Sequence, residues 1–473
     1  MNRRSFLSAA GGGLAAPYLA LAQKTAAERP NILFIASDDM NNNLGCYGHP
    51  IVKTPNLDRL AASGVRFDRA YCQFPLCGPS RCSLLTGLRP DTTRILENNI
   101  APRDTMPDVV TLPQLFRNNK WRSVRVGKMY HMDVPGSVGT NKWDDPPSWD
   151  VAISPPGAEQ HTKGVGRNIT EGRKAAWHYV AFKGDGKDQA DERATEIALE
   201  TIDKTRSQPW FLGLGYLRPH LPHVAPERFF DLYPLSRIQP AVNPPGDRDD
   251  IPKASELAIN TRANDMGMNE ADKKEAIRAY YASISYMDWQ VGRVLDALDQ
   301  QNLARKTVVV FWGDHGWHLG EHHRWHKRSL FEESARAPLI IRAPGRKGNG
   351  KASKSLVEFV DIYPTVAELG GLRGPDTLEG QSLTPLLDNP ARAFKSAAFT
   401  QMYGPKDVVG RSVVTDRYRY MRWTGPYPGE ELYDHQTDPR EFTNLAGKPE
   451  HSGTLERMRA VLDAGWRAAR AKT

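Results

Sequence analysis

Cysteine is scarce in this sequence of 473 residues, which contains only Cys46, Cys72, Cys77 and Cys82. So few cysteines in a chain of this length exclude a scaffold held together by disulfides. Their spacing also lacks the closely paired cysteines of a structural zinc site. If one of the four is consumed as a nucleophile, at most one disulfide could form among the other three.

Several other signals are absent as well. The chain has no run of Lys or Arg, no nucleic-acid-binding motif and no glycine loop that would bind a nucleotide, so we expect no nucleic-acid partner. The net charge is nevertheless +8, and the pI is about 9.1. A basic surface suits a polyanionic substrate, but a scattered, solvated set of charges explains the same value equally well.

Long apolar runs are missing too, and the N-terminal one is interrupted. The run that begins at Ala9 contains three consecutive glycines and a proline, and it is shorter than the roughly 20 residues that a membrane-spanning helix needs. It follows Arg3 and Arg4 in a pattern typical of twin-arginine signals, and an Ala-Leu-Ala cleavage site ends at Ala22. We therefore expect residues 1–22 to direct export from a bacterial cytoplasm by the twin-arginine machinery, to the periplasm or the extracellular space, with no stable membrane span.

What the chain does contain is a set of buried strands that alternate with helices. Continuous apolar runs of strand length are typical of parallel strands buried on both faces. They occur at residues 31–36, 210–216 and 307–312, and residues 122–126, which include two arginines, form a further candidate strand. Helical periodicity occurs at residues 55–64, 112–119, 191–205 and 270–300. This alternation predicts an α/β fold built on a parallel sheet.

The composition shifts near Pro390. Beyond it we expect short, half-exposed strands at residues 412–415, 418–423 and 431–434 and a helix at 455–471. These features predict a smaller C-terminal α+β subdomain. The proposed division of the mature chain is therefore a catalytic domain at residues 28–390 and a subdomain at residues 391–473.

Two long stretches, 132–188 and 234–268, show no clear periodicity. Long loops in a compact enzyme are usually functional rims or lids, so we expect these stretches to border a site. A third segment is rich in histidine, and its histidines are either specificity contacts or part of a solvated loop. These residues are His318, His322, His323 and His326.

Polar side chains follow all four of the clearest strands. They are Asp38 and Asp39, then Lys128 and His131, then His220, and finally Asp314 and His315. Because the carboxyl ends of parallel strands lie at one edge of a sheet, these side chains can converge. Three carboxylates suit a hard cation such as calcium or magnesium, while the histidine leaves a softer metal possible.

A cysteine motif lies between the first two of these strands. It reads Cys77-Gly78-Pro79-Ser80-Arg81 and continues to Leu85-Thr86-Gly87. The proline fixes the backbone after the cysteine, Ser80 can cap the following helix, and Arg81 brings a permanent charge. A buried structural cysteine before a helix is the simpler alternative.

This motif resembles the signature of the sulfatases, and the resemblance runs from about residue 30 to about residue 445. One departure is that Leu88 precedes Arg89, where the family often has Arg directly after Leu-Thr-Gly. The resemblance implies an alkaline-phosphatase-like fold with a large, mixed, mostly parallel sheet flanked by helices, and it is closest to the iduronate-2-sulfatase-like group. Further matching stretches are residues 37–39, 89–93, 127–131, 215–220, 313–317, 319–322, 325–327 and 431–434.

The resemblance also implies roles for individual residues. In this family a separate maturation enzyme oxidises the cysteine, here Cys77, to the aldehyde formylglycine, whose hydrate attacks sulfur. Arg81 would steady this nucleophile. The calcium ligands would be Asp38, Asp39, Asp314, His315 and the formylglycine oxygen at position 77. Sulfate would be bound by Lys128 and Lys327, His131 would act as the base that releases sulfate from the covalent sulfo-enzyme, and His220 would be the acid for the leaving alcohol.

We therefore expect a sulfatase that acts on a sulfated sugar or polysaccharide. The substrate that the resemblance suggests is a uronic acid sulfated at position 2. A phosphodiesterase or phosphonate monoester hydrolase of the same superfamily is the first alternative. A catalytically inactive, polyanion-binding relative is the second. At the level of single residues, Lys327 could be merely solvated, and His131 and His220 could be structural histidines.

Overall fold

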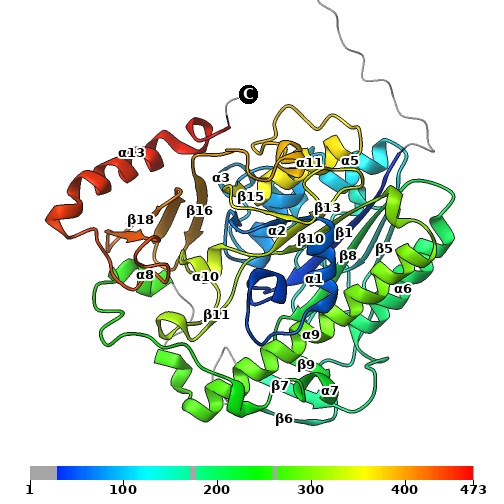
Figure 1. Ribbon diagram of the computed structural model, residues 1–473, viewed down its shortest axis with the longest axis horizontal. Helices are drawn as coiled ribbons and strands as arrows, with labels where there is room; N and C mark the ends of the chain where they lie inside the picture. Colours follow the sequence, from blue (N-terminus) through cyan, green and yellow to red (C-terminus); the bar gives the residue numbers. More distant parts are fainter. Residues whose placement is uncertain (1–28, 171–176, 259–263, 472–473) are drawn as a thin grey trace, which may run out of the picture.

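The computed structural model describes residues 29–170, 177–258 and 264–471. The expected signal peptide at residues 1–22 lies outside the described residues. The centre of the molecule is an eight-stranded sheet with helices on both faces (Figure 1). In sheet order its strands are β14 (Lys351–Ser353), β2 (Val65–Phe67), β13 (Leu339–Arg342), β10 (Thr307–Gly313), β1 (Asn31–Asp38), β8 (Trp210–Pro219), β4 (Arg122–Gly127) and β5 (Val151–Ile153).

The middle of this sheet is parallel. Strand β1 pairs in parallel with β10 on one side and with β8 on the other, and β4 continues the parallel pairing beyond β8. Only β13 runs antiparallel to its two neighbours. The expectation of a large, mixed, mostly parallel sheet is thus confirmed.

Alternate residues of β1 enter two separate cores. Leu33 and Ile35 face the core covered by α1, α6 and α9, whereas Ile32 and Phe34 face the core covered by α2, α5 and α11. This alternation follows from the two-residue period of a strand, and it explains why the whole run is apolar. The longer helices are α1 (Pro55–Ser63), α2 (Cys77–Thr86), α5 (Leu112–Asn118), α6 (Ala190–Thr205), α9 (Glu270–Gln300) and α11 (Ile362–Leu369).

Parts of the two expected loop stretches form strands and a helix. Strand β5 lies within residues 132–188 and extends the main sheet, so the expectation of a continuous loop there is wrong. Its strand signal was weak because it has only three residues. The same stretch also supplies two strands of a smaller sheet, and residues 234–268 include a short helix. These elements are β6 (Val165–Asn168), β7 (His178–Phe182) and α8 (Lys253–Ala258), and β9 (His223–Pro226), which lies outside both stretches, completes the smaller sheet.

The remaining short elements connect and brace the sheet. The helices are α3 (Pro90–Thr93), α4 (Pro102–Thr105), α7 (Glu227–Phe230), α10 (Glu332–Ala335) and α12 (Thr384–Asp388). The strands are β3 (Ala70–Tyr71), paired with β15 (Val357–Glu358), and β11 (His318–Leu319), paired with β12 (Trp325–His326).

The C-terminal part is a four-stranded antiparallel sheet covered by a helix, which confirms the expected α+β subdomain (Figure 1). Its elements are β16 (Ala398–Tyr403), β17 (Val409–Val414), β18 (Tyr418–Thr424), β19 (Gly429–Asp434) and α13 (Ser452–Ala468). The sequence patterns predicted all of these except β16.

Buried ion pairs join this subdomain to the rest of the chain. Lys395 Nζ lies 2.7 Å from Glu358 Oε2 and 2.6 Å from Asp361 Oδ1. Arg419 similarly binds Glu332 outside the subdomain, as well as Glu441 within it. Since a buried charge is costly unless it is paired, the two parts depend on each other for these contacts.

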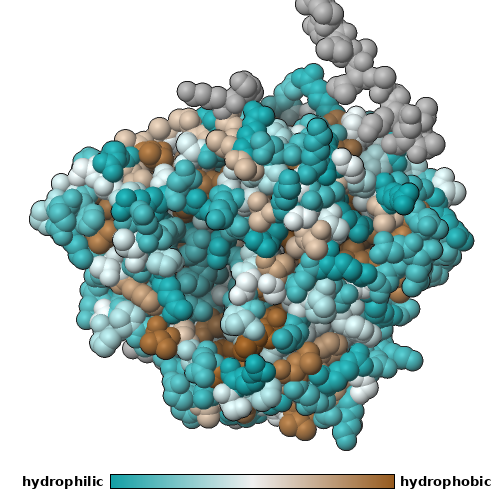
Figure 2. Space-filling view, viewed as in Figure 1, coloured by the Kyte–Doolittle hydropathy of each residue, from teal (hydrophilic) through white to brown (hydrophobic). Residues whose placement is uncertain are grey.

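The hydrophilic surface agrees with the 25% of charged residues in the sequence. The face in Figure 2 is largely hydrophilic, with apolar side chains in small separate patches and a hollow near its centre. None of the helices within the described residues is long and apolar enough to cross a membrane. Cys46, Cys72, Cys77 and Cys82 are all free thiols.

Candidate active site

The four strand ends that carry polar side chains lie side by side. Asp38 is the last residue of β1, Lys128 follows β4, His220 follows β8 and Asp314 follows β10, and these four strands are neighbours in the sheet. The structure therefore brings together the residues that the strand pattern predicted would converge. The prediction succeeded because strand direction alone decides which ends share an edge.

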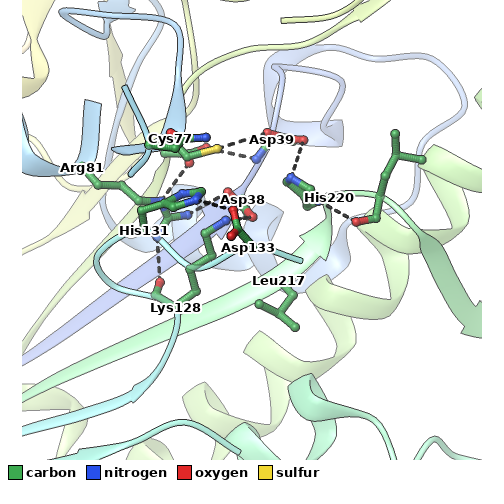
Figure 3. A network of polar contacts seen from close by, with 12 residues as sticks. Asp38, Asp39, Cys77, Arg81, Lys128, His131, Asp133, Leu217 and His220 are labelled. Atoms are coloured by element: carbon green, nitrogen blue, oxygen red, sulfur yellow. Dashed lines mark hydrogen bonds and ion pairs between the residues drawn. The ribbon is translucent and has the colours of Figure 1, made fainter. Parts of the chain in front are cut away.

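Cys77 is the first residue of helix α2 and is fully buried. Its sulfur lies 3.1 Å from Lys327 Nζ, 3.4 Å from His315 Nε2 and 3.9 Å from Asp39 Oδ1 (Figure 3 shows the contact with Asp39). Burial raises the pKa of the Cys77 thiol, but the positive charges of Lys327 and Lys128 together bring it below its usual value. The position at the start of a helix also favours negative charge there.

Ser80 does not cap helix α2, so that expectation is wrong. The helix begins at Cys77 and its N-cap is Leu76, which places Ser80 inside the first turn. Its hydroxyl instead donates a hydrogen bond to the backbone carbonyl of Asp314. Ser80 thus ties the helix that begins at Cys77 to the end of strand β10.

Three carboxylates and one imidazole surround Cys77. Asp38, Asp39 and Asp314 are fully buried, and one oxygen from each lies within 4.8 Å of the others. Oδ2 of Asp39 has no hydrogen-bond partner among the described residues. His315 donates from Nδ1 to the Gly316 carbonyl at 2.9 Å, which leaves Nε2 unprotonated in the neutral ring and directed towards the group.

These donors fit a bound divalent cation. A buried carboxylate oxygen without a partner is costly, and oxygen-rich clusters of this kind suit calcium. Burial raises the pKa of Asp39 to about 8, although Lys327 lowers it. Burial also raises the pKa of Asp38, but Lys128, His220 and Arg81 together hold it well below its usual range.

Arg81 fixes the orientation of two of these carboxylates. Its Nε donates to Asp314 Oδ2 at 2.8 Å, and one terminal nitrogen donates to Asp38 Oδ1 at 3.2 Å. The other terminal nitrogen donates to the Lys128 carbonyl at 2.7 Å. One planar guanidinium therefore connects three of the four strand ends.

Two lysines flank the cluster. Lys128 Nζ lies 2.5 Å from Asp38 Oδ2, and its side chain is fully buried. Lys327, on the loop after β12, donates to Asp39 and contacts Cys77. Burial lowers the pKa of Lys327, but Asp39 and Cys77 raise it well above its usual value, so this side chain stays cationic. The alternative that Lys327 is a solvated surface residue is therefore wrong.

The two candidate proton-transfer histidines lie at the edge of the cluster. His220 donates from Nδ1 to the Leu221 carbonyl at 2.6 Å, and its Nε2 lies 3.6 Å from Asp39 Oδ2. Its side chain is 19% exposed, so it is reachable from solvent. Nε2 of His131 lies 2.9 Å from Asp133 Oδ1. Burial lowers the pKa of both rings, and for His131 the value falls to about 4.

The histidine-rich segment is mostly structural. His318 is buried and contacts Ser329 at 2.6 Å. His322 is buried too, pairs with Asp247 and stacks on Phe331 at a ring distance of 4.2 Å. For these two residues the alternative of a solvated loop is wrong.

Sequence reasoning missed two residues near the cluster. Tyr280 lies in the predicted helix at residues 270–300, and its hydroxyl donates to the Asp39 carbonyl at 2.7 Å and accepts from Asn41 N at 2.9 Å. It therefore holds the loop that follows β1. Asp133, the partner of His131, lay in an expected loop. Its position two residues after a candidate histidine was the only signal for it.

Comparison with known proteins gives a consistent picture. A family model described as Sulfatase matches residues 30–372, and one described as N-sulphoglucosamine sulphohydrolase, C-terminal, matches residues 320–466. A sulfatase of Formosa agariphila is 36% identical and covers 93% of this chain and 88% of the relative. Iduronate 2-sulfatase of Mus musculus is 32% identical and covers 92% of this chain and 94% of the relative.

Solved structures show the same fold at lower identity. A protein bound to its substrate D-glucosamine-2-N,6-O-disulfate has a TM-score of 0.74 at 22% identity and covers 93% of this chain and 98% of its own. The phosphonate monoester hydrolase of Agrobacterium radiobacter has a TM-score of 0.79, also at 22% identity, and covers 93% and 96%. At this identity the likeness concerns the fold alone.

Proposed function

Because the chain belongs to the sulfatase family and is therefore a sulfuric ester hydrolase, we propose that it cleaves sulfate esters of a sulfated sugar with a nucleophile made from Cys77. The observation that carries this proposal is the setting of Cys77. It begins a helix and lies within 4 Å of a lysine, a histidine and an aspartate. The formylglycine made from Cys77 by a maturation enzyme would supply a hydrated aldehyde as the attacking group.

Asp38, Asp39, Asp314 and His315 would hold one calcium ion, which would draw negative charge from a sulfate oxygen. This proposal is supported by the three clustered carboxylates and by the unpartnered oxygen of Asp39. Arg81 would keep Asp38 and Asp314 in place during the reaction, since it binds both.

Lys128 and Lys327 would bind the remaining sulfate oxygens. Both ammonium groups lie at the cluster, one beside Asp38 and the other beside Cys77. Fixed positive charges in a buried site stabilise the negative charge that builds in a transition state, because they need no reorganisation at that moment.

His220 would protonate the leaving alcohol. Its Nδ1 is committed to the Leu221 carbonyl, so Nε2 is the nitrogen available for this step. His131 would serve as a base for the step that frees sulfate. Proton transfer of this kind requires both rings to be held in one orientation, and both make a side-chain hydrogen bond that does so.

The substrate proposed is a uronic acid sulfated at position 2 within a polysaccharide. It is supported by the 32% identity with iduronate 2-sulfatase over nearly the whole chain and by the net charge of +8. Export by the twin-arginine machinery would bring the enzyme to such a polymer outside the cytoplasm.

The decisive experiment combines mass spectrometry with kinetics on protein from its own host. The peptide containing Cys77 should carry an aldehyde that reacts with a hydrazide probe. The same preparation should hydrolyse p-nitrophenyl sulfate much faster than a p-nitrophenyl phosphonate monoester. An unmodified thiol in active protein, or a preference for the phosphonate, would overturn the proposal.

A further inference from the structure

His131 is held from two sides by one loop. Its Nε2 lies 2.9 Å from Asp133 Oδ1, and the ring of Trp143 packs against the imidazole at a centroid distance of 5.3 Å (Figure 3 shows the pair with Asp133). The histidine side chain is only 5% exposed, whereas that of Asp133 is 51% exposed. The carboxylate therefore closes the outer side of a nearly buried ring.

This arrangement fixes which nitrogen carries the proton. A carboxylate accepts hydrogen bonds and donates none, so Nε2 of His131 must be the protonated nitrogen. Nδ1 is then the nitrogen with the free lone pair. It is buried and has no hydrogen-bond partner among the described residues. Nδ1 is thus the only ring atom left to accept a proton.

We propose that Asp133 is a positioning residue for the sulfatase reaction. Asp133 holds His131 as the Nε2–H tautomer and so makes Nδ1 the nitrogen that acts as the base. This inference rests on the proposed function of His131. When Nδ1 accepts one proton from the reacting group, the ring gains one positive charge. The carboxylate of Asp133 already lies against Nε2 and offsets that charge without moving.

The charges around His131 explain why such a partner is needed. Burial and Lys128 both lower the pKa of His131, to about 4, while Asp133 and Asp38 act in the opposite direction. Without Asp133, Asp38 alone would oppose the effects of burial and Lys128 on the pKa of this ring.

The first test reads the tautomer directly and does not require turnover. The unmodified protein, made in a host without the maturation enzyme, would be labelled with ¹⁵N-histidine, and His131 would be assigned from the signal that His131→Gln removes. In the parent protein, Nε2 of His131 should be protonated and Nδ1 should be unprotonated. Asp133→Ala should give a mixture of tautomers, and Asp133→Glu should restore the single form.

The matched control is Asp185→Ala in the same long stretch. Asp185 is similarly exposed, at 59%, and it pairs with Arg228 at 2.5 Å and not with His131. This variant should leave the His131 signal unchanged. A parent protein with Nδ1 protonated, or an Asp133→Ala spectrum identical to that of the parent, would overturn the proposal.

The second test measures kcat and KM of the mature enzyme with p-nitrophenyl sulfate across pH. Asp133→Ala should lower kcat about 10- to 100-fold without raising KM, and Asp133→Glu should recover part of it. The acidic limb of kcat should move to lower pH, because removing the carboxylate lowers the pKa of the base. Asp185→Ala should behave like the parent.

The two tests separate two failures. If the parent enzyme does not hydrolyse the sulfate ester, the proposed function fails. The first test still decides whether Asp133 fixes the tautomer of His131, because it does not depend on turnover. If the parent is active and Asp133→Ala keeps the kcat of the control, the positioning role is wrong even when the hydrogen bond is present.

Discussion

Nζ of Lys327 lies 3.1 Å from Sγ of Cys77, although 250 residues separate them in the chain. The lysine reaches this position from a short hairpin, β11–β12, that lies beyond the end of strand β10. Its side chain is 13% exposed, so the ammonium is nearly buried beside Cys77. An anion that binds at Cys77 would lie close to this positive charge.

Replacing Lys327 by Met should lower kcat/KM for p-nitrophenyl sulfate about 10²- to 10³-fold. The reason is the loss of a fixed positive charge where negative charge develops. Lys347→Met, at an exposed position, is the matched control and should retain parental activity. Equal activity in both variants would exclude Lys327 from sulfate binding.

Cys77→Ala should abolish turnover while the protein still folds. The thiol is small and buried, so its removal should cost only about 1 kcal/mol of stability. We expect activity to fall by at least about 10⁴-fold, the cost of removing a covalent nucleophile, and labelling by an aldehyde probe to disappear. Circular dichroism and the melting temperature should stay near those of the parent. Residual activity near the parental level would contradict the nucleophile assignment.

Removal of divalent cations by a chelator should abolish activity, and added calcium should restore it. Calcium should also raise Tm in a concentration-dependent way, because a ligand that binds only the folded state stabilises it. Asp314→Asn should weaken this calcium-dependent rise in Tm. An enzyme that stays active through exhaustive chelation would rule out the metal assignment.

His220→Ala should affect alkyl sulfates far more than aryl sulfates. An alkoxide is a poor leaving group and needs a proton, whereas a nitrophenolate leaves without one. We expect a loss of about 10²- to 10⁴-fold for a sugar sulfate and a much smaller loss for p-nitrophenyl sulfate. The ratio of the two losses is the measurement, and a ratio near one would reject His220 as the acid.

The buried pair between Lys395 and Glu358 should govern acid stability. Burial raises the pKa of Glu358, but Arg89 and Lys395 lower it more, to about 2. A carboxyl with a depressed pKa stabilises the fold above its unfolded pKa of about 4.5, and this contribution is lost as pH falls towards 2. Urea unfolding between pH 7 and pH 2 should show this loss.

Lys395→Met should lower the free energy of unfolding at pH 7 by about 3–5 kcal/mol, because it removes the ammonium that binds buried Asp361 and one of the two cations that bind buried Glu358. Lys354→Met, at an exposed position, should change it by less than about 0.5 kcal/mol. A similar stability for both variants would show that the buried pair contributes nothing.

The sequence was most informative where a strand pattern fixes position. Asp38 and Asp314 each lie two positions after the last residue of a continuous apolar run, so both the existence of the strands and the shared edge could be inferred. Lys327 could not be placed in this way, because it follows a two-residue strand with almost no sequence signal. Ser80 was misassigned because a serine near a helix start looks like a cap, and only the structure shows that the helix begins three residues earlier.

The ion pairs of Lys395 and Arg419 also bear on whether a product truncated after residue 390 would fold stably. A stop codon just beyond codon 390 would leave every residue of the proposed machinery in the translated polypeptide. It would also remove Lys395 from Glu358 and Asp361 and Arg419 from Glu332. It would uncover the apolar side of Leu330 and Phe331, which pack with Met402 and Trp423. Such a product would be a target for proteolysis and not a minimal enzyme. The shortest gene that encodes a stable enzyme should therefore include the C-terminal sheet.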